Sequence, residues 1–472
     1  MRILASEILE KVGERVELAG WVSARRDHGK LIFIDLRDRT GVVQLVFNAN
    51  KQVDVYKLAD TLRPEWVIRI VGEVGERPAG MINEDIETGK VEVAVEELEI
   101  LAEAETPPFE LSTDGYEINE ELRMKYRYLD MRRGRIKKNL IARHEITDFT
   151  RRFFYDHGFT EVETPYISKS TPEGARDYLV PSRLQPGMFY ALPQSPQQYK
   201  QLLMIGGLER YFQMARCFRD EDTRGDRQPE FTQIDIEMSF VEQEDVLGLI
   251  EEYLIQLSSK LYPHKKLTLE NGRIPRMLYE VAMSKYGTDR PDVRKDKKDD
   301  NEFAPVFVVD FPMFEQREDK SWGAAHHPFT MPDVKDAKEL KAKFKKAPLS
   351  IKGLQYDVVL NGWEIFGGSI RNHNPELLKA VFEVMGHKSK DIEERFGHLL
   401  KAFRYGVPPH GGIACGFDRL VAILQNEPNI REVIAFPKTG DGRDLMMDAP
   451  SAVDKKQLKE LGLSVKKSKK NE

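Results

Sequence analysis

The stretch of sequence that decides the fold runs from residue 217 to residue 237. It begins Cys217-Phe-Arg-Asp-Glu-Asp222 and ends Arg227-Gln-Pro-Glu-Phe-Thr-Gln-Ile-Asp-Ile-Glu237. Two apolar runs flank a polar segment that contains a glycine, and this pattern predicts two strands joined by a loop. Asp235 and Glu237 are two positions apart, so both side chains are expected on one face of the second strand.

The charged residues of this hairpin allow two interpretations. Arg219 carries a planar, permanently charged guanidinium that suits a phosphate, and Phe231 can stack on a base. The same residues can equally form a surface hairpin held by salt bridges. The stretch by itself leaves the two alternatives even.

A second motif favours the phosphate site. The sequence Gly411-Gly-Ile-Ala-Cys-Gly-Phe-Asp-Arg-Leu-Val-Ala-Ile-Leu424 predicts a strand, a glycine turn and an apolar helix. Arg419 then lies in the first helical turn, where the positive end of the helix dipole disfavours a cation. A cation in that position is better explained if it meets a polyanion such as ATP. The glycines let the backbone come close to such a ligand.

Residues 121–454 predict a large domain of mixed helices and strands. Helical spacing is found in 119–133, 136–157, 195–206, 243–262 and 389–404, and strand-like runs in 209–218, 231–240, 306–311, 354–366 and 411–415. Because both short turns and long excursions join the strands, we expect a largely antiparallel sheet flanked by helices. No glycine-rich phosphate loop of the Walker or dinucleotide type follows a strand, which agrees with this fold class.

Residues 1–102 predict a separate small β domain. Alternating apolar residues mark five strands in 16–22, 31–35, 42–47, 66–72 and 91–98, and helical spacing in 52–62 separates the third strand from the fourth. This is the layout of an OB-fold, which binds nucleic acid on the face of its central strands. Any other small barrel is the alternative. Residues 103–120, which include Pro107-Pro108, predict a linker.

Composition excludes several classes of protein. The chain has 472 residues, a net charge of -6 and two distant cysteines, Cys217 and Cys415. We therefore expect no disulfide framework and no zinc site, and a reducing cytosol as location. No apolar run is long enough for a membrane helix, and acids interrupt the N-terminus where a signal peptide would need apolar residues. The charged run 288–302 predicts a solvated loop, and the lysine-rich tail 455–472 predicts a frayed end.

Three motifs, in order, resemble motifs 1, 2 and 3 of the class II aminoacyl-tRNA synthetases. They are Gly158-Phe-Thr-Glu-Val-Glu-Thr-Pro165, the hairpin 217–237 and the segment 411–424. Four further stretches are similar to the bacterial-type aspartyl-tRNA synthetases: Ser170-Thr-Pro-Glu-Gly-Ala-Arg-Asp-Tyr178, Ala191-Leu-Pro-Gln-Ser-Pro-Gln197, Ala325-His-His-Pro-Phe-Thr330 and Gly367-Gly-Ser-Ile-Arg371. The resemblance covers almost the whole chain. It implies an α+β protein with an OB-fold anticodon-binding domain, a class II catalytic domain, and a cytoplasmic homodimer built through motif 1.

The resemblance also implies a reaction and its residues. Aspartate would be activated with ATP and Mg²⁺ and then transferred to tRNA(Asp), in a site that works by positioning and charge stabilisation and needs no enzyme nucleophile. The implied catalytic residues are Arg219, Glu364 and Arg419. Those implied for ATP are Arg219, Asp220, Glu221, Gln228, Phe231, Glu364, Gly416, Phe417, Asp418 and Arg419. Those implied for aspartate are Glu173, Gln197, Lys200, Arg219, Asp235, His326, His327 and Arg371. Asp357 and Glu364, seven apart in one strand-like run, would hold the Mg²⁺; a purely structural pair is the alternative.

Specificity for an acidic amino acid follows from two of these residues. By resemblance, Arg371 and Lys200 bind the side-chain carboxylate of aspartate, and a bidentate arginine–carboxylate pair is strong and selective. Asparagine would leave the buried cations unpaired. Three alternatives stay open: a related synthetase for asparagine or lysine, a non-catalytic tRNA-binding paralogue, and an amidating enzyme on the same core.

In the N-terminal domain, Arg26, Phe33 and Gln44 match positions that read the anticodon. Phe33 alternates with core positions, so it is expected to face outward, where it can stack on a base; a lone surface aromatic is the alternative. His28 and Gly80 resemble the non-discriminating branch, which charges both tRNA(Asp) and tRNA(Asn).

One departure from the family concerns size. Bacterial-type relatives carry a domain-sized insertion between the second and third motifs. In this chain only the charged run 288–302 stands in that place. The motifs on both sides are intact, so the family resemblance holds, whereas whatever the inserted domain does in those relatives is not carried over to this chain.

Overall fold

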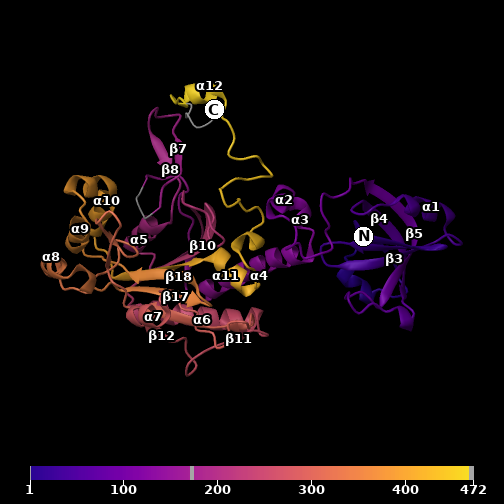
Figure 1. Ribbon diagram of the computed structural model, residues 1–472, viewed down its shortest axis with the longest axis horizontal. Helices are drawn as coiled ribbons and strands as arrows, with labels where there is room; N and C mark the ends of the chain where they lie inside the picture. Colours follow the sequence, from indigo (N-terminus) through magenta and orange to yellow (C-terminus); the bar gives the residue numbers. More distant parts are fainter. Residues whose placement is uncertain (1, 171–174, 467–472) are drawn as a thin grey trace. The chain divides into compact units, whose positions relative to one another are not determined.

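The computed structural model describes residues 2–170 and 175–466 (Figure 1). The chain divides into two compact units, Met1–Ile118 and Asn119–Glu472. Each unit has its own hydrophobic core, built from its own strands and helices.

The first unit is a closed five-stranded barrel. Its strands pair in the order β1-β2-β3-β5-β4, with β4 also pairing with β1. The elements are η1 (Ala5–Glu10), β1 (Arg15–His28), β2 (Leu31–Arg37), β3 (Val42–Asn48), α1 (Val53–Thr61), β4 (Val67–Glu76), η2 (Ala79–Met81) and β5 (Val91–Ala102). Alternate residues of β2, such as Ile32 and Ile34, are buried in the barrel. A five-stranded barrel with a helix between the third and fourth strands is the predicted OB-fold, which is confirmed.

The second unit is built on one large sheet. Among the described residues it has eight strands in the order β12-β14-β17-β18-β19-β10-β9-β6. In chain order these are β6 (Thr160–Glu161), β9 (Arg210–Phe218), β10 (Glu230–Ser239), β12 (Arg276–Leu278), β14 (Pro305–Val309), β17 (Gln355–Leu360), β18 (Trp363–Ile370) and β19 (His410–Gly416). All neighbours pair antiparallel except β12 with β14 and β6 with β9. The expected largely antiparallel sheet is therefore confirmed.

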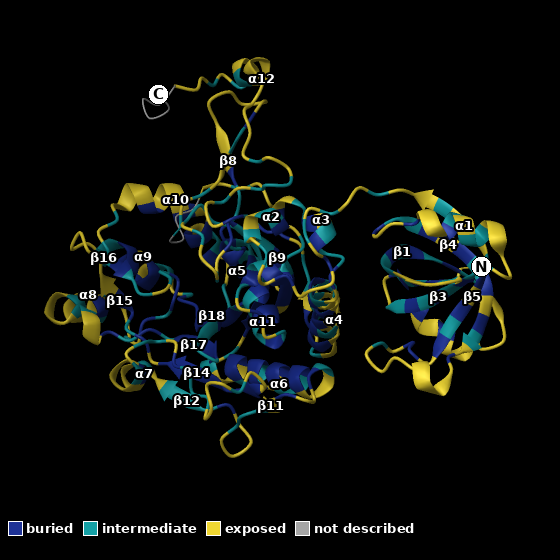
Figure 2. Cartoon of the chain, turned by 45° about the vertical axis from the view of Figure 1, so that its right-hand side comes forward, coloured by how far each residue is buried: buried dark blue, intermediate teal, exposed yellow. Residues whose placement is uncertain are grey.

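The two faces of this sheet differ in polarity. Ile234 and Ile236 of β10 and Ile413 of β19 belong to the main core, together with residues of α4 (Gly134–Asp156), α6 (Gln243–Leu261) and α11 (Phe417–Leu424). Figure 2 shows the buried faces of α6 and α11 in dark blue. The period of two along a strand places Asp235 and Glu237 on the opposite face. Helices on one side of an antiparallel sheet thus leave its other side for polar groups.

The remaining elements surround this sheet. The helices are α2 (Glu120–Lys125), α3 (Arg127–Asp130), α5 (Gln197–Ile205), α7 (Tyr279–Tyr286), α8 (Ala337–Lys346), η3 (Pro348–Ser350), α9 (Pro375–Val384), α10 (Ser389–Phe403), η4 (Ile430–Val433) and α12 (Lys455–Glu460). Three small sheets pair β7 (Leu179–Pro181) with β8 (Phe189–Ala191), β11 (Lys266–Leu267) with β13 (Glu302–Phe303), and β15 (Phe314–Gln316) with β16 (Trp322–Ala324). The described helices include none that is both long and apolar enough to cross a lipid bilayer.

Three local expectations are corrected. The run 354–366 is not one strand but the β17–β18 hairpin, which turns at Asn361 and Gly362 with φ of 52° and 83°. The run 288–302 is not wholly solvated, because the buried Glu302 accepts hydrogen bonds from the backbone N–H groups of two residues within it (both 3.1 Å). The tail is not frayed at its start, since Asp454 caps the short helix α12.

Candidate active site

The β9–β10 hairpin carries the residues from which the site is built. Its register pairs Cys217 with Phe231 and Gln213 with Asp235, so the loop between the strands holds the polar segment around Arg219. β10 lies between β9 and β19 in the sheet, and the two-residue strand β6 pairs with the other side of β9. The predicted strand–loop–strand hairpin is therefore present, and it lies inside the fold instead of at its surface.

A cavity of about 300 Å³ opens on the polar face of the sheet. Most of the residues that the sequence proposed for the site line it together: Gln197, Lys200, Arg219, Glu221, Gln228, Phe231, Asp235, His326, His327, Glu364, Arg371, Gly416, Asp418 and Arg419. They come from segments up to more than 200 residues apart in the sequence. It is therefore the fold that brings these residues together around one cavity. The surface-hairpin interpretation does not fit this arrangement.

Two cations and two carboxylates form a buried group in the cavity wall. Lys200 Nζ lies 2.8 Å from Asp235 Oδ1 and 3.2 Å from Glu237 Oε2. The Arg371 guanidinium donates to both Glu237 oxygens, from Nε at 2.9 Å and Nη2 at 3.0 Å, and from Nη1 to Ser369 Oγ at 2.7 Å. A guanidinium has five N–H donors, so two remain after these contacts. The group can therefore receive an additional carboxylate.

The pKa values of the two carboxyl groups of this set are shifted in opposite directions. Burial raises the pKa of Asp235 above its usual range, against the effect of Lys200. Burial acts in the same direction on Glu237, but the charges of Arg371 and Lys200 outweigh it and hold the pKa of Glu237 at about 2. Asp235 Oδ2 is buried and has no hydrogen-bond partner among the described residues. A buried unpaired oxygen is costly, and here it is available to a donor from a ligand.

The histidine pair at 326–327 presents neutral donors. His327 Nδ1 accepts a hydrogen bond from the backbone N–H of Phe329 (3.1 Å), so a neutral ring carries its hydrogen on Nε2. That Nε2 is buried without a partner in the described structure. Surrounding protein and the cations Arg371 and Arg219 lower the pKa of His326 to about 4, although its ring is open to solvent through the cavity. Burial lowers the pKa of His327 as well.

A second group of cations lies at the other end of the hairpin. The Arg219 guanidinium lies 5.1 Å above the centre of the Phe231 ring. Arg419, the third residue of α11, donates to the Asp226 carboxylate (3.2 Å) and to the backbone carbonyls of Asp226 and Glu364 (3.1 and 2.9 Å). The predicted position of Arg419 in the first helical turn is confirmed. Two guanidinium groups and an aromatic face in one cavity can bind a nucleotide.

Asp357 and Glu364 come together in a way that the sequence spacing did not predict. They lie on neighbouring strands, where Asp357 pairs with Gly367 and Glu364 with Val359, across a bulge in β17–β18. A Cβ placed on Gly367 would lie 3.3 Å from Asp357 Oδ1, 3.4 Å from His326 Nε2 and 3.5 Å from Glu364 Oε1. These three groups therefore converge on one small space. Burial and the charge of Glu364 raise the pKa of Asp357 well above its usual range.

This pair is chemically suited to a hard cation. Asp357 Oδ1 is buried without a hydrogen-bond partner in the part of the chain that is described. Oxygen atoms are the ligands that Mg²⁺ prefers, and it commonly binds one or two carboxylates plus phosphates and water. No cluster of three or more His, Cys, Asp or Glu side chains arranged for a metal occurs within residues 2–170 and 175–466. A metal here would need ligands from a bound substrate.

Several proposed residues are not free in the cavity wall. Gln228 uses both ends of its amide on the backbone of Lys438 (3.0 and 2.7 Å), and Asp418 binds Arg143 and the N–H of Thr232. Three others are absent from the cavity lining: Asp220, Asp357 and Phe417, the last of which packs under Arg143. Glu173 lies outside the described residues.

The cavity also contains residues that sequence reasoning missed. These are Ser195, Asp226, Arg227, Gln233, Ile365, Gly367, Ala414 and Ile430. Two of them, Gln233 and Ala414, lie two positions from Asp235 and Gly416 on the same strands, so for these two the period of two was the available signal. Asp226 had no such signal, because only the folded loop brings it to Arg419.

On the barrel face that was proposed for the anticodon, the side chains contact one another through hydrogen bonds and a ring contact. Arg26 donates to both Asp35 oxygens (2.6 and 2.7 Å) and to Gln44 Oε1 (3.2 Å). The His28 ring meets the Phe33 ring edge-on, with centroids 5.7 Å apart. Phe33 is partly exposed between buried neighbours, as its alternation predicted. Gly80 lies apart from them in the exposed turn η2.

Comparisons with known proteins agree with this geometry. Residues 119–440 match the family model of class II tRNA synthetases (D, K and N), and residues 16–101 match the OB-fold nucleic acid binding domain. Two relatives are each 41% identical and named aspartate–tRNA(Asp/Asn) ligase. That of Desulfatibacillum aliphaticivorans aligns with 97% of this chain and 96% of its own, and that of Rubrobacter xylanophilus with 96% and 95%. A Staphylococcus aureus relative, named aspartate–tRNA ligase, is 40% identical over 96% of this chain and 97% of its own.

The alignments also bear on the missing insertion. The alignment with the Desulfatibacillum protein spans 583 positions, whereas the whole of this chain has 472 residues. The relative therefore contains residues within the aligned region that this chain lacks.

Solved structures show the same fold. Asparaginyl-tRNA synthetase from Pyrococcus horikoshii is 24% identical with a TM-score of 0.73, over 93% of this chain and 98% of that one. A putative aspartyl-tRNA synthetase from Leishmania major is 22% identical with a TM-score of 0.74, over 93% and 94%. With the domain matches and the identity over nearly full length, this chain belongs to the class II tRNA synthetase family of D, K and N enzymes.

Proposed function

We propose that this enzyme activates L-aspartate with ATP and transfers the aspartyl group to tRNA(Asp) and to tRNA(Asn). The observation that carries the proposal is the buried set of Lys200 and Arg371 around Asp235 and Glu237, in the same cavity as Arg219 and Arg419. One end of the cavity thus suits a small zwitterion with a second carboxylate, and the other suits a nucleotide. The names of the relatives that are about 40% identical support the same activity.

The substrate groups have partners of matching charge. The two remaining N–H donors of Arg371 and the Nε2–H of His327 face a side-chain carboxylate. Asp235 Oδ2, which lacks a partner in the described structure, accepts from the ammonium group. An asparagine side chain would place an amide where charge-assisted hydrogen bonds are made. This polarity selects aspartate over asparagine and lysine.

The chemistry needs positioning more than an enzyme nucleophile. In the first step an oxygen of the aspartate α-carboxylate forms a bond to the α-phosphorus, the bond to the β-phosphate oxygen breaks, and pyrophosphate leaves. Arg219 would stabilise the negative charge that develops on the α-phosphate oxygens. In the second step a hydroxyl of the terminal ribose of tRNA attacks the aspartyl carbonyl carbon and AMP leaves. Phe231 and Arg419 would hold adenine between an aromatic face and a guanidinium plane.

Mg²⁺ would be held by Asp357 and Glu364 together with the phosphates of ATP. The raised pKa of Asp357 supports this role, because a cation relieves the repulsion between the two carboxylates. The ion would supply positive charge to the phosphates. His326, which converges on the same space, would then be kept neutral by the same surroundings.

We also propose a cytoplasmic homodimer. The support is α4 and the following β6, which form motif 1 in the family resemblance. Ile141 and Tyr155 of α4 expose 47% and 51% of their surface, and large apolar side chains at such exposure are candidates for contact with a second copy.

Amino-acid-dependent ATP–pyrophosphate exchange tests the first step. Purified enzyme should exchange rapidly with L-aspartate, and asparagine or lysine should support at most a small fraction of that rate. Exchange that depends on asparagine or lysine but not on aspartate would contradict the assignment.

Aminoacylation of two transcripts tests the choice of tRNA. Wild-type enzyme should aspartylate tRNA(Asn) and tRNA(Asp) at similar rates, because His28 and Gly80 resemble the non-discriminating branch. His28→Leu, which removes the ring beside Phe33, should increase the preference for tRNA(Asp). A strong preference for tRNA(Asp) in the wild-type enzyme would show a discriminating synthetase instead.

A further inference from the structure

Three buried polar side chains form a line from the wall of the cavity into the protein. Gln197 Nε2 lies 3.1 Å from Gln201 Oε1, and Gln201 Nε2 lies 3.0 Å from His410 Nε2. His410 Nδ1 lies 2.8 Å from the backbone oxygen of Pro408. Gln197 is 4% exposed, and Gln201 and His410 are fully buried. Of the three, only Gln197 lines the cavity.

The hydrogen positions in this line follow from its inner end. The Pro408 carbonyl can only accept, so His410 Nδ1 must carry the hydrogen. In the neutral ring His410 Nε2 is then an acceptor. Burial lowers the pKa of His410, with Arg371 and His373 acting in the same direction and Glu237 opposing them. The ring is therefore neutral at pH 7 in these surroundings.

The ring of His410 fixes the donor-to-acceptor direction of the next two hydrogen bonds toward the cavity. Because His410 Nε2 accepts, Gln201 must present its NH2 group to the ring and its carbonyl oxygen to Gln197. Gln197 must in turn donate from its own NH2 group. Its carbonyl oxygen is left as an acceptor, and among residues 2–170 and 175–466 no group donates to it. The NH2 group of Gln197 is therefore held by Gln201, and the carbonyl oxygen is the end of the amide that stays available to accept.

We propose that Gln201 and His410 are positioning residues that fix the Gln197 amide so that its carbonyl oxygen faces the ammonium group of the amino-acid substrate. This role rests on the proposed activation of aspartate. It adds the hydrogen bonds that determine which end of the Gln197 amide faces the substrate. With the opposite orientation, the NH2 group of Gln197 would face a cation and one charge-assisted hydrogen bond would be lost. Among the described residues, Asp235 Oδ2 would still be available to accept from the ammonium group.

Gln201→Met removes both hydrogen bonds of the Gln201 amide while keeping the length of the side chain, and so tests whether that amide positions Gln197. In ATP–pyrophosphate exchange, the KM for aspartate should rise about tenfold or more, since a hydrogen bond to a charged group is worth one to two powers of ten in affinity. The KM for ATP should stay near the wild-type value. Gln198→Met is the matched control, because Gln198 is a buried amide on the same helix that does not line the cavity and takes no part in the hydrogen bonds among Gln197, Gln201 and His410.

Two further variants separate orientation from packing. In a Gln197→Ala background, Gln201→Met should have almost no additional effect on the KM for aspartate, because there is no amide left to orient. Gln201→Glu should keep the KM for aspartate close to the wild-type value. Its carboxylate still accepts from Gln197, provided that His410 takes up a proton, and this variant also serves if Gln201→Met does not fold.

The outcomes are distinct. If wild-type enzyme gives no aspartate-dependent exchange, the proposed function fails. If wild-type exchange is normal, the positioning role fails in any of three cases: Gln201→Met behaves like Gln198→Met, it raises both KM values equally, or it has its full effect in the Gln197→Ala background.

Discussion

At the scale of single residues, the aspartate end of the cavity depends on a glycine, Gly412, which has no Cβ atom. A Cβ on Gly412 would collide with Glu237 Oε2 and with the backbone oxygen of Ile236. The glycine was expected to let the backbone approach a ligand, but the structure shows that it makes room for Glu237. That carboxylate then holds Arg371 and Lys200 in the cavity. Gly416, which has free space at its Cβ position apart from the Arg419 side chain, lines the cavity as expected.

Gly412→Ala should therefore impair the aspartate end of the site. The added methyl group displaces Glu237 and with it Arg371, so the KM for aspartate in pyrophosphate exchange should rise at least tenfold, the equivalent of about 1.4 kcal/mol. The KM for ATP should change much less. Gly248→Ala on α6 is the control, since its Cβ meets nothing within 4 Å and alanine favours a helix. An equal change in both KM values would contradict this role of Gly412.

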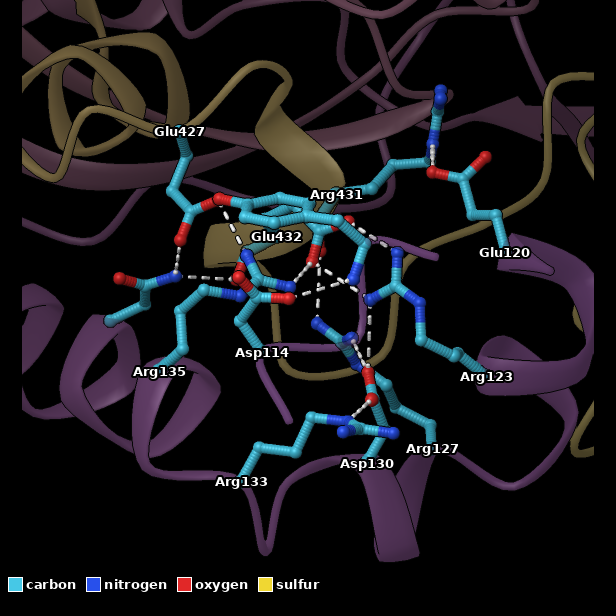
Figure 3. Close-up of polar contacts among 12 residues, drawn as sticks. Asp114, Glu120, Arg123, Arg127, Asp130, Arg133, Arg135, Glu427, Arg431 and Glu432 are labelled. Atoms are coloured by element: carbon cyan, nitrogen blue, oxygen red, sulfur yellow. Dashed lines mark hydrogen bonds and ion pairs between the residues drawn. The ribbon is translucent and has the colours of Figure 1, made fainter. Parts of the chain in front are cut away.

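At the scale of elements, buried ion pairs hold η4 against α2, α3 and the start of α4. Figure 3 shows Arg123 and Arg135 meeting the Glu432 carboxylate, at 2.8 and 2.9 Å, while Asp130 binds Arg127 and Arg133 (2.6 and 2.7 Å). Glu432 is about 300 positions from Arg123 and Arg135 in the sequence. The helical pattern 119–133 did not reveal this, and it is broken at Tyr126 into two short helices.

Glu432→Gln should destabilise the protein by about 3 kcal/mol, because it removes the buried carboxylate that Arg123 and Arg135 share. Burial alone would raise the pKa of Glu432, but Arg123 and Arg135 lower it to about 2. A carboxyl group with a depressed folded-state pKa adds stability above its unfolded value of about 4.5, and this is lost as the pH falls toward 2. Urea unfolding should therefore show a wild-type advantage at pH 7 that shrinks between pH 4.5 and 2. An advantage that does not change with pH in that interval would contradict the ion-pair explanation.

At the scale of the whole molecule, the residues proposed for tRNA recognition and those proposed for the chemistry lie in different units. The cavity is formed by residues 195–430 of the second unit, and the face around Phe33 belongs to the barrel of the first. A change confined to the barrel face should affect tRNA and leave adenylate formation intact.

Phe33→Ala tests whether the barrel face acts on tRNA without acting on adenylate formation. Loss of one base-stacking contact should lower kcat/KM for tRNA in aminoacylation by roughly tenfold to a hundredfold, from about 1–3 kcal/mol for each stacked base. Aspartate-dependent pyrophosphate exchange should be unchanged. Equal loss in both assays would mean that Phe33 is needed for folding, and no loss in either would make it a lone surface aromatic.

Local patterns were sufficient for much of this architecture. The period of two predicted the five barrel strands and the shared face of Asp235 and Glu237, because strand geometry depends on neighbouring residues. The first-turn position of Arg419 followed from the glycine turn before an apolar helix. The family, the α+β fold and the proposed site residues followed from long motifs in a fixed order.

Other features depended on contacts between distant segments. The sequence placed Asp357 and Glu364 on one strand, but the positive φ angles at Asn361 and Gly362 fold them onto neighbouring strands. Asp226 reaches Arg419 only through the folded loop. The orientation of the Gln197 amide depends on His410, which lies more than 200 residues away. Periodicity and motif order therefore determined the elements and the chemistry that they suggest, whereas burial and hydrogen-bond direction, which arise only when remote groups meet, decided the pKa shifts and the polarity of the site.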